Sequence, residues 1–335
     1  MAILKVIGTL AVSTRGSKLI IVWFALMALF PTAALGQAVR VELHPLSTTT
    51  LSDQEFLTGI KEGQPTIVAG ELRLPGHGSD RLPTVVLIHG SGGVGARETS
   101  WASHLNKLRI ATFTIDSFTG RGLTNTGENQ ALLGRLAMIV DAYRGLGLLA
   151  KHPRIDTSRI ALMGFSRGAQ TTLYASLKRF RRMHSPAGVE FAAYLPFYAN
   201  CSTTYIDDVE VSDRPIRIFH GSADDYNPVS VCRTYVDRLR VAGKDVQIFE
   251  YPAAHHMFDN PAAPPPRHFP RNQTTRNCTL QENPLGQIIN TKTNQPFTYE
   301  DSCVERGVTM GFSREAYAKA LSDVTELLKA IFKFN

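Results

Sequence analysis

The sequence predicts an α/β fold built on a doubly wound, mostly parallel sheet. Apolar runs of strand length alternate with longer runs of helix length between about residues 84 and 251, and this alternation is typical of repeated βαβ units. Two apolar runs, Thr84–Ile88 and Ile160–Met163, are nearly continuous, as expected for parallel strands that helices cover on both faces. Residues 37–335 are numerous enough to bury one large core, so we expect them to form a single domain.

The predicted elements follow one another in a regular order. Val68–Pro75 alternates in polarity and predicts an early antiparallel strand. The other predicted strands are Thr84–Ile88, Ile110–Ile115, Ile160–Met163, Phe191–Tyr198, the run from Pro215 to the turn at Gly221, and Asp245–Tyr251. The predicted helices are Glu98–Leu108, Gln130–Ala150, Ala169–Leu177 and Ser313–Phe332, with Ser313 as N-cap of the last helix.

Residues 1–36 have the composition of an export signal. Three basic residues come first, followed by the uninterrupted apolar run Leu19–Phe30. Small residues, Ala34 and Gly36, precede a cleavage point before Gln37. The run is shorter than the ~20 residues of a comfortable membrane span. We therefore expect a periplasmic or extracellular protein without stable membrane association after cleavage, the alternative being an uncleaved signal anchor.

The charge of the chain indicates no particular class of partner. The formal net charge is +7, but residues 1–36 contain three basic residues and no acidic one. The remaining chain is therefore only mildly basic. It has no basic run with interleaved aromatic residues, so the sequence does not predict nucleic-acid binding.

The segment Gly164-Phe-Ser166-Arg-Gly168 lies between a predicted strand and a predicted helix. This Gly-x-Ser-x-Gly context is that of a nucleophile elbow, in which a strained turn exposes a serine hydroxyl at the positive end of the following helix. Gly164 and Gly168 remove side chains that would collide with the backbone of so tight a turn. The alternative is an ordinary strand-to-helix loop. The nucleophile elbow is favoured over this loop if the chain also contains an acid and a base that could act with Ser166.

Candidate partners follow in the order that an elbow serine requires, first an acid and then a histidine. Asp224 and Asp225 follow one predicted strand, and His255 and His256 follow the next. Loops at the carboxyl ends of parallel strands are where an open α/β sheet carries its functional groups. The residues alone leave open which aspartate and which histidine act. His89 and His220, each before a glycine at a strand end, are interpreted as packing residues.

A glycine-rich loop, His89–Gly95, follows the strand Thr84–Ile88. Such a loop lets backbone N–H groups turn toward the negative oxygen that develops during acyl transfer. We expect the N–H groups of Ser91 and of Arg167, the residue directly after the serine, to form this oxyanion hole.

With these motifs in place, the chain resembles the α/β-hydrolases of the dienelactone hydrolase-like family. The resemblance extends over most of the chain, from about Val68 to the C-terminal helix. Its motifs are Leu87–Gly93, Asp116–Gly122, Gly164–Gly168, His220–Asp224 and Ala254–Phe258.

The resemblance implies a catalytic triad and a reaction. The family's acid stands three residues after the strand-ending glycine, which selects Asp224, and its His-x-Phe pattern selects His256. Dienelactone hydrolase itself has a cysteine nucleophile, whereas this chain has Ser166, so the resemblance implies a serine hydrolase without the dienelactone activity. No metal or cofactor is implied. Arg121 matches a family element, and we interpret it as fixing loop structure, with a role in holding a substrate carboxylate as the alternative.

Four cysteines, Cys201, Cys232, Cys278 and Cys303, follow the export signal. An even number in an oxidising compartment predicts two disulfides, with three possible pairings. We favour Cys201–Cys232, which would brace the loop that holds Asp224, together with Cys278–Cys303. The alternative is buried free thiols. No C-x-x-C spacing suggests a metal site.

Residues 260–311 break the alternation of strands and helices. They contain three consecutive prolines, many Asn and Thr residues, and little periodicity. We expect an insertion without regular structure, stapled by Cys278–Cys303 before the last helix. It follows His256 directly, so it is either a rim that shapes the substrate pocket or a surface excursion without substrate contact.

The sequence therefore predicts an exported serine hydrolase that cleaves small-molecule carboxylic esters through an acyl-enzyme intermediate. Ester, thioester, lactone and polyester substrates all fit the pattern. The alternatives are an exported serine peptidase of the same fold and a non-catalytic binding protein.

Overall fold

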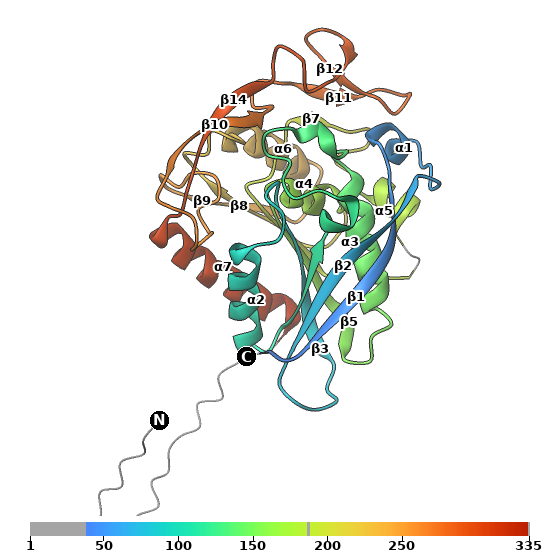
Figure 1. Ribbon diagram of the computed structural model, residues 1–335, viewed down its shortest axis with the longest axis vertical. Coiled ribbons are helices and arrows are strands. Elements are labelled where there is room, and N and C mark those ends of the chain that lie inside the picture. Colours follow the sequence, from blue (N-terminus) through green and yellow to red (C-terminus); the bar gives the residue numbers. More distant parts are fainter. Residues whose placement is uncertain (1–37, 186–187, 334–335) are drawn as a thin grey trace, which may run out of the picture. The chain divides into compact units, whose positions relative to one another are not determined.

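The computed structural model describes residues 38–185 and 188–333 (Figure 1). Its central sheet contains eight strands in the order β1-β2-β4-β3-β5-β6-β8-β9. These strands are β1 (Ala38–Thr50), β2 (Gln64–Pro75), β3 (Leu82–Ile88), β4 (Ala111–Asp116), β5 (Ile155–Phe165), β6 (Ala193–Phe197), β8 (Ile216–Gly221) and β9 (Val246–Tyr251).

The sheet is mostly parallel, as predicted. From β4 to β9 every neighbouring pair of strands is parallel, whereas β1 and β2 are antiparallel to each other and β2 is antiparallel to β4. Strand β1 is missing from the sequence prediction. Its apolar residues Val41 and Leu43 are exposed, whereas the less exposed positions between and after them include Glu42 and His44, so the pattern of apolar residues does not mark an inward face.

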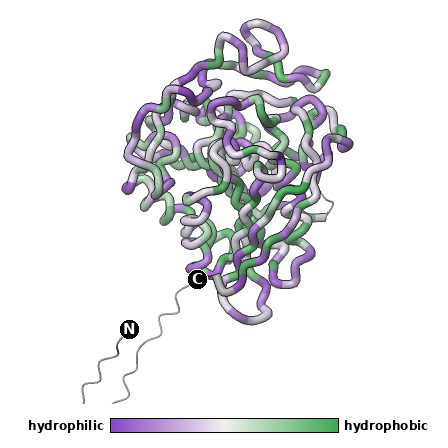
Figure 2. The backbone as a smooth tube through the Cα atoms, viewed as in Figure 1, coloured by the Kyte–Doolittle hydropathy of each residue, from purple (hydrophilic) through white to green (hydrophobic). Residues whose placement is uncertain are grey.

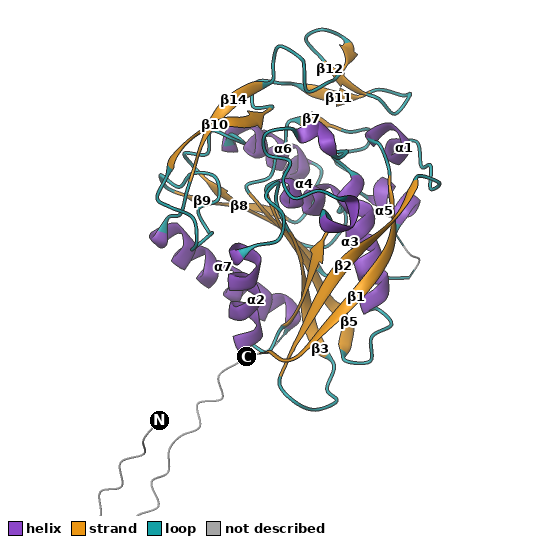
Figure 3. Ribbon diagram, in the orientation of Figure 1, coloured by secondary structure: helices purple, strands orange, loops and turns teal. Residues whose placement is uncertain are grey.

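Helices cover both faces of the sheet (Figure 3). The helices are α1 (Asp53–Leu57), α2 (Ala96–Lys107), α3 (Ala137–Leu149), α4 (Arg167–Tyr174), α5 (Lys178–His184), α6 (Val229–Val241) and α7 (Arg314–Phe332). Buried residues of α2 and α7 pack in one core cluster with Val85 and Leu87 of β3, and those of α3, α4 and α6 pack in another with Val86 and Ile88. Alternate residues of β3 thus face opposite layers, which is the doubly wound arrangement. Figure 2 shows hydrophobic residues concentrated along these central strands.

The prediction of a long helix over Gln130–Ala150 is wrong for the first turns of that range. The chain forms a short 3₁₀ turn, Gln130–Leu132, and α3 begins only at Ala137. Gly134 lies between them, and glycine is a poor helix residue. The carboxylate of Asp53 accepts a hydrogen bond from the N–H of Leu136 at 3.1 Å, which supplies an acceptor where the helix starts.

The prediction that residues 260–311 lack regular structure is also wrong. Strands β10 (Arg267–Thr274) and β14 (Glu305–Met310) pair antiparallel, and β11 (Leu280–Glu282), β12 (Ile288–Asn290) and β13 (Gln295–Pro296) form a second small sheet with β7 (Thr203–Thr204). Most of these strands are too short to show periodicity in the sequence. They become regular because they pair with one another and with β7, which lies far away along the chain.

Both predicted disulfides are present. Cys201 is bonded to Cys232, and Cys278 to Cys303, so all four cysteines are paired. The first bond joins the segment after β6 to α6, and the second ties the two ends of the small strands β11–β13 together.

The export signal predicted over residues 1–36 lies outside the described residues. Within the part of the chain that the structure describes, no helix combines the length and the apolar character needed to cross a membrane.

Candidate active site

Ser166 stands in a strained turn between β5 and α4. Its φ is +55°, a region that residues other than glycine rarely occupy. The two flanking glycines make the turn possible. A Cβ atom at Gly164 would lie 2.1 Å from the carbonyl oxygen of Gly168, and one at Gly168 would lie 2.2 Å from that of Ile88. No larger residue fits either position, as expected for a nucleophile elbow.

His256 connects Ser166 to Asp224. Its Nε2 lies 2.9 Å from the Ser166 Oγ, and its Nδ1 lies 2.8 Å from the Asp224 Oδ2. An ionised carboxylate can only accept hydrogen bonds, so Nδ1 carries the proton and Nε2 is free to accept from the serine hydroxyl. His256 and Asp224 are almost entirely buried. The three residues that the sequence singled out therefore form one hydrogen-bonded chain.

The surroundings of Asp224 stabilise its charged form. Burial by itself would raise its pKa, but the charge of His256 and the hydrogen bonds from His220 and His256 outweigh burial and hold the pKa well below its ordinary value. His220 is therefore more than the packing residue expected from the sequence: its Nε2 lies 3.5 Å from the Asp224 Oδ2. The N–H groups of Tyr226 and Asn227 donate to its Oδ1, each at 2.9 Å. Asp224 is thus held as a carboxylate in a fixed orientation.

The neighbouring candidates, Asp225 and His255, do not make the contacts that Asp224 and His256 make. The Oδ1 of Asp225 accepts a hydrogen bond of 2.7 Å from the N–H of Thr309 in β14, so Asp225 anchors the insertion. His255 is partly buried, and its Nδ1 has no hydrogen-bond partner among the described residues. Neither residue joins the chain from Ser166 to Asp224.

Two tyrosines hold the His256 ring, and the sequence did not single out either. The ring centroids of Tyr198 and Tyr226 lie 4.5 and 4.6 Å from that of His256. The Tyr198 hydroxyl donates to Asp259 at 2.7 Å and accepts from Arg97 at 3.2 Å. Burial raises the pKa of Asp259. Tyr226 stands in the same turn as Asp224, and that proximity in sequence was the only signal available for it.

The loop that carries Ser91 lies against the serine. A Cβ atom at Gly90 would lie 3.3 Å from the Ser166 Cβ. The backbone N–H groups of Ser91 and Arg167 donate to no other backbone group within the described residues. These two N–H groups are therefore free to donate hydrogen bonds to a negatively charged oxygen beside Ser166.

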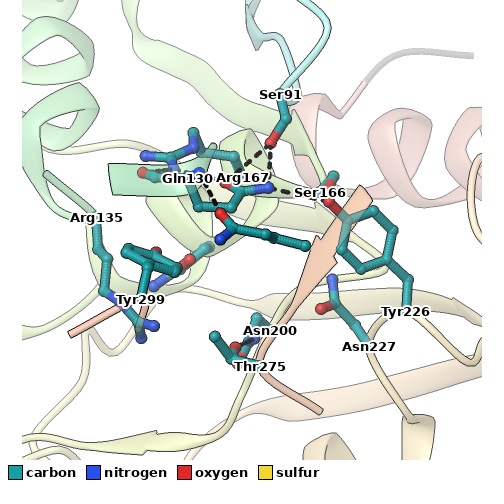
Figure 4. Close-up of a pocket in the computed structure, with 12 residues that line it drawn as sticks. Ser91, Gln130, Arg135, Ser166, Arg167, Asn200, Tyr226, Asn227, Thr275 and Tyr299 are labelled. Atoms are coloured by element: carbon teal, nitrogen blue, oxygen red, sulfur yellow. Dashed lines mark hydrogen bonds between the residues drawn. The ribbon is translucent and has the colours of Figure 1, made fainter. Parts of the chain in front are cut away.

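Gln130 ties this region together and was missed by the sequence reasoning. Its Nε2 donates to the Tyr226 hydroxyl at 2.9 Å and to the Ser91 Oγ at 3.2 Å, and its Oε1 accepts from the Arg167 guanidinium at 2.6 Å (Figure 4). Gln130 is distant in sequence from all three partners, so no local pattern identifies it.

Two cavities meet at Ser166, and Ser91 and Tyr226 also line both. The larger cavity, of about 460 Å³, is lined by the glycine-rich loop and by His256, Met257, Phe269 and Met310, among others. The smaller one, of about 40 Å³, is lined by residues with polar or charged side chains (Figure 4). Its other lining residues are Gln130, Arg135, Arg167, Gln170, Asn200, Asn227, Gln273, Thr275 and Tyr299.

Arg121 lines neither of these cavities. Its guanidinium makes a bidentate ion pair with Asp141 at 2.7 and 2.9 Å and donates to the carbonyl oxygen of Ser117. It has the structural role that we favoured from the sequence. His89 is likewise a packing residue, with its Nε2 accepting from the N–H of Ser117.

Among the described residues, one group of side chains has the spacing of metal ligands. It consists of Glu42 and His44 of β1 and of His152, which follows α3. Both histidines already hydrogen-bond to Glu42. The Nδ1 of His152 accepts from the N–H of Arg154, which leaves the proton on the Nε2 that a metal would need. The group lines neither cavity.

The sheet topology and the elbow define an α/β-hydrolase. The chain belongs to the dienelactone hydrolase family, whose sequence model matches residues 75–332. A search of curated proteins found no match.

The chain is also similar to solved structures, one of which shares the fold over most of its length. A dienelactone hydrolase-like promiscuous phosphotriesterase from metagenomic libraries is 16% identical, with a TM-score of 0.55, over 87% of this chain and 98% of its own. A thermophilic esterase from the planctomycete Thermogutta terrifontis is 16% identical, with a TM-score of 0.45, over 58% of this chain and 80% of its own.

Proposed function

We propose that this protein is a serine hydrolase that cleaves carboxylic esters of small molecules through an acyl-enzyme intermediate. The observation that carries the proposal is the hydrogen-bonded chain from the Ser166 Oγ through His256 to Asp224. A serine hydroxyl is a weak nucleophile unless a base removes its proton, and a base works best when a third group fixes its orientation.

The reaction proceeds in two steps, acylation of Ser166 and hydrolysis of the acyl-enzyme. The Ser166 Oγ attacks the ester carbonyl carbon while His256 Nε2 takes the hydroxyl proton. The bond to the leaving oxygen then breaks, and His256 returns that proton to it, which releases the alcohol. Water next attacks the acyl-serine, gives one proton to His256, and releases the acid as the proton passes back to Ser166. Asp224 keeps Nδ1 protonated and stabilises the imidazolium in both steps.

The oxyanion hole consists of the N–H groups of Ser91 and Arg167. Each donor of this kind contributes roughly 3–4 kcal/mol to the stability of the transition state in related chemistry. The hydrogen bonds from Gln130 to Ser91 and from Arg167 to Gln130 link the two segments that carry these donors.

Labelling with a fluorophosphonate probe tests the proposal. We expect the wild-type protein to be modified at Ser166 and to hydrolyse nitrophenyl acetate, and Ser166→Ala to do neither. Ser117→Ala is a matched control, because Ser117 is fully buried and lines neither cavity at Ser166. Labelling at another residue, or hydrolysis by Ser166→Ala near the wild-type rate, would contradict the proposal.

We also propose that the enzyme works outside the cytoplasm, in the periplasm or the extracellular medium. The basic and apolar pattern of residues 1–36 supports export. The two disulfides support an oxidising compartment. Residues 37–335 would then be the mature enzyme, one hydrolase domain with its insertion at 260–311.

A further inference from the structure

The small cavity beside Ser166 has a buried arginine in its wall. Arg135 immediately precedes Leu136 and α3, and it is 4% exposed. Its Nη1 donates to the Thr203 Oγ1 at 3.2 Å, and its guanidinium lies over the rings of Phe297 and Tyr299. Its Nε is buried and has no hydrogen-bond partner in the described structure.

The guanidinium of Arg135 also forms no ion pair with a carboxylate of the described residues. None of the ion pairs of the described residues includes it, whereas Arg97, which lines the larger cavity, is paired with Glu98 at 2.6 Å. The acid that interacts with Arg135 electrostatically is Asp53, which interacts in the same way with Arg167. Burial raises the pKa of Asp53. Arg135 and Arg167 both line the small cavity, and no aspartate or glutamate of the described residues lines it, so this wall of the cavity is positively charged.

A second unpaired donor lies in the same wall. Gln170, on the first turn of α4, is 9% exposed, and its Nε2 has no partner within the described residues. Both residues line the small cavity, and buried donors are nearly always satisfied in native proteins, so the two side chains are suited to share an acceptor bound there. A positive wall with unpaired N–H groups fits an anionic acceptor, and guanidinium favours a planar carboxylate.

The position of His256 decides which part of an ester enters the small cavity. His256 must deliver its proton to the leaving oxygen, so the alcohol portion lies beside it. His256 lines the larger cavity and does not line the smaller one. The acyl portion of the substrate therefore points into the small cavity, whose far side carries Arg135 and Tyr299, away from Ser166 (Figure 4).

We propose that the small cavity is a subsite in which Arg135 and Gln170 bind a carboxylate at the end of a short acyl arm. The preferred substrates are then monoesters of short dicarboxylic acids. This inference rests on the proposed function, because it presumes an acyl group on Ser166. The cavity volume of about 40 Å³ limits the arm to a few atoms.

The subsite also gives the insertion a role. Thr275 and Tyr299 both belong to residues 260–311 and line the small cavity. The Thr275 Oγ1 accepts a hydrogen bond of 2.9 Å from Asn200, and Tyr299 lies over the guanidinium of Arg135. The insertion thus closes the end of the cavity where the carboxylate binds and determines the length of the acyl arm.

Paired substrates test the proposal. The anionic substrates are the nitrophenyl monoesters of malonic and succinic acid, and the neutral ones are the nitrophenyl esters of propionic and butyric acid. After subtraction of spontaneous hydrolysis, we expect the ratio of kcat/KM for the anionic ester to kcat/KM for the neutral ester to be at least about ten for the wild-type enzyme. Arg135→Met should lower this ratio about tenfold or more, as expected for the loss of a hydrogen bond to a charged group. Arg144→Met, an exposed arginine on α3, should leave the ratio unchanged. Gln170→Leu replaces Arg135→Met if that variant does not fold by circular dichroism.

A binding measurement separates this inference from the proposed function. Titration calorimetry of Ser166→Ala with malonate and succinate should detect binding that is lost in Ser166→Ala/Arg135→Met. If the wild-type enzyme cleaves the neutral esters at least as well as the anionic ones, the subsite is wrong and the serine hydrolase stands. If no ester is cleaved and the probe does not label Ser166, the proposed function fails, and calorimetry still decides whether Arg135 binds carboxylates. Absence of binding together with an unchanged ratio in Arg135→Met overturns the subsite.

Discussion

At the scale of single residues, the site depends on which of two neighbouring side chains faces which partner. Asp224 and Asp225 are chemically identical, yet one carboxylate lies 2.8 Å from His256 and the other holds the backbone of β14. Successive side chains along an extended or turning backbone point in different directions. Two adjacent acids therefore serve two different contacts.

We predict opposite outcomes for the two aspartates. Asp224→Asn should lower kcat for ester hydrolysis about 10⁴-fold, because the amide no longer holds the histidine in the correct tautomer. Asp225→Asn should retain kcat within about threefold, because the amide oxygen still accepts from Thr309. Steady-state kinetics of both variants, with circular dichroism as a control for folding, check this. Equal losses in the two variants would contradict the assignment.

The lowered pKa of Asp224 also makes stability depend on pH. A carboxyl group whose pKa is lower in the folded state stabilises the fold fully above its unfolded pKa of about 3.9. That contribution disappears as the pH falls from there through the folded pKa, which is lower still. The difference in the free energy of unfolding between the wild type and Asp224→Asn should therefore be largest near neutral pH and shrink in acid. Urea denaturation at about pH 7 and about pH 2.5 measures it, and a difference independent of pH would count against this account.

At the scale of elements, the insertion is held by a covalent bond and by short strands rather than by a large core. Cys278 and Cys303 are 25 residues apart in sequence, and the strands between them include only short pairings. The same insertion contributes Thr275 and Tyr299 to the small cavity. Its stability and the shape of the substrate site are therefore coupled.

Removal of this disulfide should affect both properties. We predict that Cys278→Ser/Cys303→Ser loses about 3 kcal/mol of unfolding free energy, because a loop of this size gains conformational entropy in the unfolded chain. KM should rise more than kcat falls, because Ser166, His256 and Asp224 lie outside the insertion. Urea denaturation and steady-state kinetics measure the two effects. An unchanged KM would show that the insertion does not contact substrate.

At the scale of the whole molecule, the chain combines a hydrolase domain with an N-terminal segment of a different character. The described domain buries its apolar residues on both faces of one sheet. We predict that a host able to export the full-length chain releases a protein that begins at Gln37. Mass spectrometry of the exported protein checks this. An intact N-terminus in the membrane fraction would instead favour an uncleaved anchor.

The sequence predicted the α/β architecture, because it depends on local patterns. Local patterns also singled out Ser166, Asp224 and His256, which the structure places in one hydrogen-bonded chain. Buried parallel strands are continuous apolar runs, and the loops at their carboxyl ends meet at one edge of the sheet. Contacts between distant segments gave no such signal. Gln130 reaches Tyr226 across 96 positions of sequence, and Leu280 of β11 pairs with Thr203 of β7, which is also distant in sequence.

The sequence by itself therefore determined the α/β class, the serine at the elbow and the order of its partners, because each follows from residue types at fixed spacings. The tertiary structure decided which aspartate and which histidine meet Ser166, because adjacent side chains take different directions that only the folded backbone sets. It also decided that Arg135 and Gln170 share one small cavity with the insertion. Such a cavity exists only where several distant segments pack together, and no single stretch of sequence encodes it.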